Sequence, residues 1–332
     1  MFGVSTPFAH WGFNLVRLII EAISGSTVSL HITSLEELRE GFARRDGASV
    51  VVTSDFPDAQ LSSFVCSSEL PLIAFSDDPR DTVDWTIKSR HMNGFDAARF
   101  SSRLFSAIEL PLTTERTLLI PSSPNQTAEA VVTQIVSHIF PGRGEWLAVQ
   151  TFKHLIESGQ IADNSIPDRG QYRAAELVDM SPSSAEDSAA INRVVDCYSD
   201  LMFGRKALEF DWPLEFFTRP DKRAPRAAFD LTGPARVLFY GPYLHLPVGH
   251  WVARTEFEID GAVSGVEAMT DIYINEVVTE KTFEMPEKGI FAYNLSFRVD
   301  DPHFAVQIRL FIKKSAIEGV FLPRSVRVRP GL

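Results

Sequence analysis

The residues best suited to chemistry stand at the ends of two short apolar runs in the first third of the chain. Asp55 comes soon after Ser49–Thr53, and the string Asp-Asp-Pro-Arg-Asp, residues 77–81, closes the run at 70–75. Short apolar runs bounded by Asp, Pro and Ser are typical of strands buried on both faces of a parallel sheet. Ligands bind beyond the carboxyl ends of such strands. We therefore expect a site at this edge, with Asp55 as a candidate catalytic acid or base.

A second polar group surrounds the predicted start of the first helix. Ser5, Thr6 and His10 are expected on a loop after the first strand, ahead of a helix over residues 13–23. His10 is a candidate general base or oxyanion donor in that position. In the alternative interpretation, Ser5 or Thr6 satisfies turn amides and His10 packs against a neighbouring ring. For Asp55, the alternative is a helix cap.

Asp77, Asp78 and Asp81 have a spacing that could bridge a divalent cation and a diphosphate. In prenyl-diphosphate enzymes such strings lie on helices, whereas this one follows a strand. We therefore predict no metal site and expect Asp78 or Asp81 to cap the next helix. Cys66 and Cys197 follow no metal-ligand spacing, and we expect two buried thiols rather than a disulfide.

The elements that must position these residues follow from hydrophobic periodicity. Short apolar runs alternate with amphipathic segments over the first 140 residues, and Ser34-Leu35-Glu36-Glu37 has the pattern of a capping box. This order predicts a parallel sheet with right-handed crossovers. Beyond residue 235, apolar and polar side chains alternate with period two, as in half-buried antiparallel strands. The predicted fold is a three-layer α/β domain (1–158), a connection with a helix (159–234) and an antiparallel, jelly-roll-like β-sandwich (235–332).

Strand parity separates core positions from surface positions in the predicted sandwich. Trp251 and Tyr293 fall on the core side, so we exclude them as platforms for a ligand. Tyr273 falls on the polar side, where its ring could stack on a sugar while neighbouring side chains bind hydroxyl groups. Phe311 is a second candidate ring, and packing against another domain would explain either one equally well. The predicted sugar-binding residues are Asp271, Tyr273, Asn275, Arg298 and Arg309.

The sequence Pro79-Arg80-Asp81 after a strand resembles the 3′-phosphate loop of the sulfotransferases, a family with a P-loop-like α/β fold that uses the sulfate donor PAPS. The family loop reads Arg-x-Pro-[Arg/Lys]-Asp followed by Ser, and here Asp77 replaces the first Arg and Trp85 the Ser. The family's 5′-phosphate loop offers Lys or Arg, and residues 5–12 contain neither. The resemblance implies Ser5, Thr6 and Arg80 as cofactor-binding positions.

A second resemblance concerns residues 240–251, which read Tyr-Gly-Pro-Tyr-Leu-His-Leu-Pro-Val-Gly-His-Trp. The pattern is similar to the opening strand of jelly-roll carbohydrate-binding modules. It implies that the C-terminal domain binds a carbohydrate or polysaccharide.

Composition limits the partners. The chain has 32 Lys and Arg against 43 Asp and Glu, a net charge of −11, which disfavours nucleic acid and anionic membranes. It has no run of 18 apolar residues that could span a membrane and no signal peptide, so the default expectation is a cytoplasmic protein.

Three functions remain: a glycan-binding protein with an inactive sulfotransferase-like domain, a PAPS-dependent polysaccharide sulfotransferase, and a structural or assembly component. Charged hydrogen bonds contribute about 1.5–3 kcal/mol each. Loss of two cations would therefore weaken PAPS binding on the order of a thousandfold. We predict glycan binding without a cofactor, and leave self-association or a larger protein assembly open.

Overall fold

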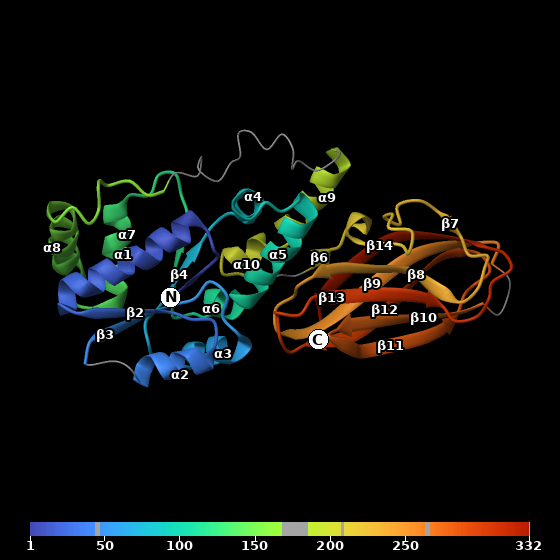
Figure 1. Ribbon diagram of the computed structural model, residues 1–332, viewed down its shortest axis with the longest axis horizontal. Coiled ribbons are helices and arrows are strands. Elements are labelled where there is room, and N and C mark those ends of the chain that lie inside the picture. Colours follow the sequence, from blue (N-terminus) through green and yellow to red (C-terminus); the bar gives the residue numbers. More distant parts are fainter. Residues whose placement is uncertain (44–46, 168–184, 207–208, 263–265, 332) are drawn as a thin grey trace. The chain divides into compact units, whose positions relative to one another are not determined.

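The computed structural model describes residues 1–43, 47–167, 185–206, 209–262 and 266–331 (Figure 1). The chain forms two compact units whose segments alternate along the sequence. Of the described residues, one unit holds 1–91, 107–167 and 199–206, and the other holds 92–106, 185–198 and 209–331. Helix α5 (Gly94–Ala107) therefore belongs mainly with the β-rich unit, although its position in the sequence lies within the first predicted domain.

The described residues of the first unit form five parallel strands in the order β2-β3-β1-β4-β5. A single parallel bridge between Phe2 and Ser54 joins the pair β2-β3 to the other three strands. The strands are β1 (Phe2–Gly3), β2 (Thr27–His31), β3 (Ser49–Thr53), β4 (Leu72–Ser76) and β5 (Thr117–Pro121). This arrangement confirms the predicted parallel α/β architecture.

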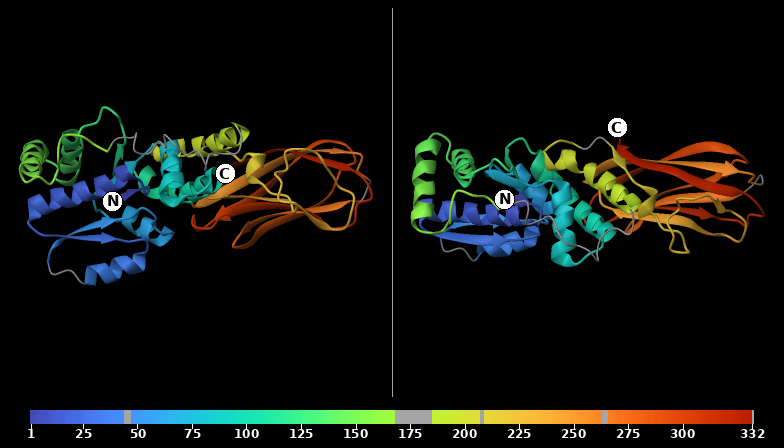
Figure 2. Two further views of the ribbon diagram at one scale, coloured as in Figure 1. Left: turned by 45° about the horizontal axis from the view of Figure 1, so that its top comes forward. Right: turned by 90° about the horizontal axis from the view of Figure 1, so that it is seen from above.

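Helices cover both faces of this sheet. On one face, α1 (Pro7–Ser24), α7 (Ala128–Ile139) and α8 (Gly144–Glu157) share a core with β3, β4 and β5. On the other face, α2 (Leu35–Ala43) and α3 (Ala59–Ser67) pack on a second core. Figure 2 shows α1 and α2 on opposite sides of the blue strands. The remaining helices of this unit are α4 (Pro79–Arg90), α6 (Glu109–Thr113) and α10 (Ser199–Met202).

Side-chain caps determine where several of these helices begin. Thr6 caps α1 by accepting from the backbone N–H of Ala9 (3.3 Å), with Pro7 as the first helical residue. Helix α1 thus begins six residues before the predicted start, because proline is well suited to the first helical position. As a result, His10 lies on a helix and not on a loop. Asp78 caps α4 as expected, while Asp58 rather than Asp55 caps α3.

The capping box before α2 is confirmed. The Glu37 carboxylate accepts from the Thr33 N–H (2.6 Å), and the Ser34 hydroxyl accepts from the Glu37 N–H (3.2 Å). These bonds satisfy amides that the first turn of a helix leaves unpaired.

The second unit is built on a sandwich of two antiparallel sheets, with the orders β11-β10-β13-β8 and β12-β9-β14-β6; β7 also pairs with β14. This confirms the predicted β-sandwich after the α/β region. Its strands are β6 (Phe210–Asp211), β7 (Phe229–Asp230), β8 (Arg236–Leu244), β9 (Gly249–Asp260), β10 (Glu267–Ile274), β11 (Glu276–Glu284), β12 (Gly289–Val299), β13 (Val306–Ile312) and β14 (Val320–Pro330).

Aromatic rings fill the space between these two sheets. Phe257 stacks on Phe321 with ring centroids 5.2 Å apart, and Tyr293 lies 6.0 Å from Phe257. Trp251 is 5% exposed and donates from Nε1 to the Pro247 carbonyl (3.0 Å). Trp251 and Tyr293 are therefore core residues, as parity predicted.

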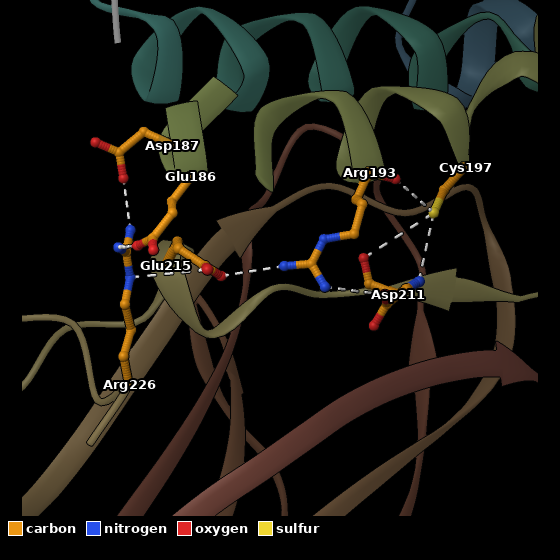
Figure 3. Close-up of polar contacts among 7 residues, drawn as sticks. All are labelled: Glu186, Asp187, Arg193, Cys197, Asp211, Glu215 and Arg226. Atoms are coloured by element: carbon orange, nitrogen blue, oxygen red, sulfur yellow. Dashed lines mark hydrogen bonds and ion pairs between the residues drawn. The ribbon is translucent and has the colours of Figure 1, made fainter. Parts of the chain in front are cut away.

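Ion pairs tie helix α9 (Ala185–Asp196) to the 3₁₀ helix η2 (Leu214–Phe216) and to the irregular stretch between η2 and β7 (Figure 3). Arg226 pairs with Glu186 (2.9 Å) and Asp187 (2.5 Å), while Arg193 reaches Glu215 (3.3 Å). Because these arginines are engaged with carboxylates, we assign them to structure rather than to ligand binding.

The thiol of Cys197 lies beside the same network. It donates to the Arg193 carbonyl (3.1 Å), and burial raises its pKa to about 11. A thiol with so high a pKa is a poor nucleophile at neutral pH. Cys66 and Cys197 are both free thiols, as predicted, but each is only partly buried and not fully buried as expected. Among the described residues, no helix combines the length and the apolar character needed to cross a membrane.

Candidate functional site

The first candidate site lies at the carboxyl edge of the parallel sheet, between β1 and β4. The connection after β1 leads toward β2 and the connection after β4 toward β5, in opposite directions across the sheet. Such a reversal is where ligands of open α/β sheets bind. There the Thr6 hydroxyl donates to the Asp77 carboxylate, and the two residues are 1% and 2% exposed.

Two histidines and a carboxylate lie near this edge. His31 Nε2 is 3.3 Å from Asp55 Oδ1, and His31 Nδ1 is 3.0 Å from the hydroxyl of Thr53. Burial lowers the pKa of His10, and the nearby Asp55 opposes this effect while His31 adds to it. The charge of Asp55 thus acts on His10, and these are the two predicted catalytic residues. The structure adds His31, which the sequence analysis missed although it ends a parallel strand.

The residues at this edge do not fit PAPS. The Thr6 hydroxyl already donates to Asp77 and caps α1, so it is not available to a phosphate. Ser5 is half-buried, and the helix that follows it begins with Pro7, which has no N–H to donate. A second carboxylate, Asp55, lies at the same edge. Arg80 is exposed on α4, where its backbone N–H bonds to Asp78 (2.9 Å). Electrostatic stabilisation of a transferring sulfuryl group needs cations where this site presents carboxylates.

The second candidate site is the outer face of sheet β11-β10-β13-β8. Its centre is a bidentate pair between residues opposite each other on β13 and β10: Arg309 donates from Nε and Nη2 to the Asp271 carboxylate (2.8 and 2.7 Å). The side chains are 26% exposed for Arg309 and 3% for Asp271. The bond to Asp271 raises the pKa of Arg309, so the guanidinium is always charged.

Four partly exposed rings surround this pair. The guanidinium carbon of Arg309 lies 4.5 Å from the ring centroid of Tyr273 and 5.6 Å from that of Phe311. Tyr240 stands opposite Arg309 on β8, and its ring meets that of Tyr243 edge-on at 6.3 Å. Burial raises the pKa of the Tyr243 hydroxyl, and the nearby Tyr240 raises it further. We call Tyr240, Tyr243, Tyr273 and Phe311, with Arg309 and Asp271, the aromatic face.

The other two predicted sugar-binding residues lie elsewhere. Asn275 is exposed in the tight connection between β10 and β11, with a positive φ of 61°. Arg298 lies on β12 in the other sheet and pairs with Asp300 (2.6 Å). The prediction that Arg298 shares one face with Asp271 and Arg309 is therefore wrong, because outward side chains share a face only when their strands belong to the same sheet.

Tyr240 and Tyr243 were missed as site residues. The pairing of β13 with β8 shifts register between Val306 and Gln307 and again between Leu310 and Phe311. Each bulge changes which side chains point outward, so a count of alternate positions along β8 does not identify the surface rings.

The aromatic face offers ring surfaces and fixed polar atoms side by side. Rings can stack against apolar C–H groups, while an anchored guanidinium donates hydrogen bonds to hydroxyls. Among the described residues, Arg309 makes no hydrogen bond besides those to Asp271, so Nη1 is available to a ligand. We find no group of His, Cys, Asp and Glu with metal-binding geometry in the described parts of the chain.

No protein-family model matches this chain, and neither does any curated protein. Solved structures resemble parts of it. A family 16 carbohydrate-binding module is 11% identical over 30% of this chain and 74% of that chain, with a TM-score of 0.24. The C-terminal CBM6 of LamC from Zobellia galactanivorans is 10% identical over 31% and 99%, with a TM-score of 0.21. The infectious bursal disease virus VP2 subviral particle is 11% identical over 31% and 35%, with a TM-score of 0.19. Likenesses this small identify neither a family nor a function.

Proposed function

We propose that this protein binds a glycan through the aromatic face of its β-sandwich. The observation that carries the proposal is the arrangement of four partly exposed rings around the anchored Arg309 on one sheet. Sugars present apolar C–H patches beside hydroxyl groups, so they are complementary to a surface that alternates rings with hydrogen-bonding groups.

The charge of the face favours a neutral glycan. The carboxylate of Asp271 accepts two hydrogen bonds from Arg309, so the pair has no net charge. A chain with a net charge of −11 also repels polyanions at long range. Neutral polysaccharides are therefore the preferred class within this proposal.

Preorganisation supports the same proposal. The carboxylate fixes Arg309 before any ligand arrives, and strand pairing fixes Tyr240 and Tyr273 in the sheet. Side chains that are already ordered lose little conformational entropy on binding, which leaves more of the contact energy for affinity.

For the α/β unit we propose no PAPS-dependent reaction, since its sheet edge presents carboxylates where the donor phosphates would need cations. The assay is transfer of labelled sulfate from PAPS to a panel of polysaccharides. Transfer at ordinary enzyme rates would refute this part of the proposal and restore the sulfotransferase interpretation.

The decisive binding experiment compares Tyr273→Ala with the wild type on immobilised neutral polysaccharides. Loss of a stacking ring at the centre of a site costs about 2 kcal/mol of binding energy, or roughly thirtyfold in Kd. Stability should fall by less than about 1 kcal/mol, the contribution of a partly exposed cation–π contact. The measurements are affinity electrophoresis and thermal unfolding.

The matched control is Asn294→Ala, which removes an exposed polar side chain from β12 on the outer face of the other sheet. It should leave both binding and stability unchanged. Failure of the wild type to bind any neutral glycan would sink the proposal. If Tyr273→Ala and the wild type bound with equal affinity, the aromatic face would not be the binding site.

A further inference from the structure

Helix α5 places an arginine beside the aromatic face. Arg99 donates from Nε to the Pro242 carbonyl (3.0 Å), and its guanidinium carbon lies 5.7 Å from the ring centroid of Tyr243. Helix α5 comes between β4 and β5 in the sequence, but residues 92–106 belong to the same unit as the sandwich. A side chain from the first third of the chain therefore lies next to a ring of the aromatic face.

Fixed contacts hold the Arg99 guanidinium in one orientation. Besides the bond to Pro242, Nη2 donates to the Phe216 carbonyl (3.1 Å) and Nη1 to the Asp96 carboxylate (3.1 Å). The guanidinium carbon also lies 5.6 Å from the Phe216 ring centroid, and Phe95 meets that ring edge-on at 4.9 Å. Among the described residues Arg99 makes these three hydrogen bonds, so each terminal nitrogen keeps one N–H for a ligand. The side chain is 26% exposed, which allows a ligand to reach it.

Tyr243 connects Arg99 to the centre of the aromatic face. Burial and the neighbouring Tyr240 raise the pKa of its hydroxyl, whereas Arg99 and Arg309 both lower it. Both guanidiniums are therefore close to Tyr243. The backbone of Tyr243 has a φ of 65°, which a bulky residue rarely adopts. Such conformations persist where surrounding contacts impose them, and here the carbonyl that precedes Tyr243 is bound by Arg99.

The surface side chains of this region form a row that crosses the strands. Tyr273 on β10 stands opposite Gln307 on β13, and Gln307 stands opposite Pro242 on β8. Neighbouring strands are about 5 Å apart, so the row from β10 to β8 already covers about 10 Å. Tyr243 and Arg99 extend it further. The row is longer than one sugar ring, and its aromatic rings are separated by hydrogen-bonding groups.

We propose that Arg99 forms one end of the glycan site, which takes a chain of several neutral sugars lying across the strands from Tyr273 to α5. This inference rests on the proposed function. The rings of Tyr273 and Tyr243 contact the C–H faces of different sugars, and the remaining N–H groups of Arg99 donate to hydroxyls of the last one. Asp96 balances the charge of Arg99, so this end of the site also favours a neutral chain.

The test measures Kd by isothermal titration calorimetry of the full chain with cello-, xylo- and manno-oligosaccharides of two to six sugars. For the series that binds, the hexasaccharide should bind roughly tenfold more tightly than the disaccharide, because only the longer chain reaches Arg99. Arg99→Ala should remove most of this difference and leave the Kd of the disaccharide unchanged. Tyr273→Ala should weaken binding at every length. Thermal unfolding checks that both variants fold.

The matched control is Arg254→Ala on β9, which removes an exposed arginine from the outer face of the other sheet. It should not change Kd at any length. A measurement on the wild type gives independent evidence. The Nε–H NMR signal of Arg99, assigned by its loss in Arg99→Lys, should shift with the hexasaccharide and stay in place with the disaccharide.

The outcomes separate this inference from the proposed function. If no series binds to the wild type, both fail. If Tyr273→Ala abolishes binding but affinity does not depend on length, the aromatic face remains the site and Arg99 is not part of it. Equal losses for the disaccharide and the hexasaccharide in Arg99→Ala would show that Arg99 only supports the fold. Tighter binding of hexagalacturonate than of any neutral hexasaccharide would overturn the preference for a neutral chain.

Discussion

Each sheet of the sandwich presents an arginine–aspartate pair on its outer face, and the two pairs differ in almost every physical respect. Arg309 and Asp271 form two hydrogen bonds, and their side chains are 26% and 3% exposed. Arg298 and Asp300 meet at 2.6 Å through one bond, and their side chains are 58% and 76% exposed. The first pair lies among aromatic rings on neighbouring strands, while the second joins residues two apart in the chain.

This difference shows how burial changes the role of the same chemical pair. A water-exposed pair contributes little, because solvent screens the attraction and both side chains lose entropy when they are held together. A buried bidentate pair holds its guanidinium in one orientation, and its members depend on each other for solvation. Only the buried pair can serve as a rigid part of a binding surface.

The largest effect should come from Asp271→Ala. This variant leaves the Arg309 guanidinium partly buried without its partner, and breaking such a pair costs about 3 kcal/mol of unfolding free energy. Asp300→Ala on the other face should cost less than about 0.5 kcal/mol. Urea denaturation of both variants provides the measurement. Equal losses would show that the two pairs do not differ in the way proposed.

A second comparison of buried and exposed groups uses histidines. His245 is 8% exposed, and its Nδ1 lies 2.8 Å from the Pro302 carbonyl. Burial lowers its pKa from 6.5 to about 4, an effect to which nearby Arg103 and His303 add and which the bond to Pro302 and the charge of Asp301 oppose. The unfolded chain therefore binds a proton more readily than the folded chain between pH 6.5 and pH 4.

Above about pH 6.5 His245 is neutral in both states and does not reduce the free energy of unfolding, but this free energy falls as the pH is lowered toward 4. At pH 5 the titration of His245 should reduce the free energy of unfolding by about 2 kcal/mol. Urea denaturation from pH 7 to pH 5 should show this loss in the wild type and a smaller slope in His245→Gln. The exposed His250 on β9 supplies the control, since His250→Gln should keep the wild-type slope. A slope unchanged by His245→Gln would contradict the prediction.

The smallest effect should come from exchanging the guanidinium for an ammonium. Arg309→Lys keeps the charge but loses the bidentate fork and the flat surface that lies over Tyr273, so stability should fall by about 1 kcal/mol. Within the proposed function, glycan affinity should fall roughly tenfold. Arg298→Lys should change neither quantity. Thermal unfolding and affinity electrophoresis measure the two effects, and a loss of affinity in Arg298→Lys would move the proposed site to the other sheet.

Periodicity determined much of the architecture in advance. Apolar runs between Asp, Pro and Ser predicted the parallel strands, and period two predicted the sandwich with Trp251 and Tyr293 in its core. Local chemistry also predicted the capping box before α2 and a cap of α4 by Asp78 or Asp81, of which the structure has Asp78, since each depends on residues within four positions. Such features follow from the sequence because the interacting groups are neighbours in the chain.

The start of α1 could not be predicted in this way, although its cap is also local. The 3.6-residue pattern of apolar side chains is strongest after residue 13, so the first six residues of the helix, from Pro7 onward, were not recognised. The error changed the expected surroundings of His10, which stands on the first turns of α1 and shares its electrostatic environment with His31 and Asp55.

Along the regular strands β9 and β12, the sequence alone determined which side chains face the core and which face outward, because that choice depends only on alternation along one strand. Tertiary structure decided which outward side chains meet. Arg309 joins Tyr240 and Tyr273 because β13 lies between β8 and β10, while Arg298 is separated from them because β12 belongs to the other sheet. Strand order and register shifts arise from packing between segments far apart in the chain, so no local pattern records them.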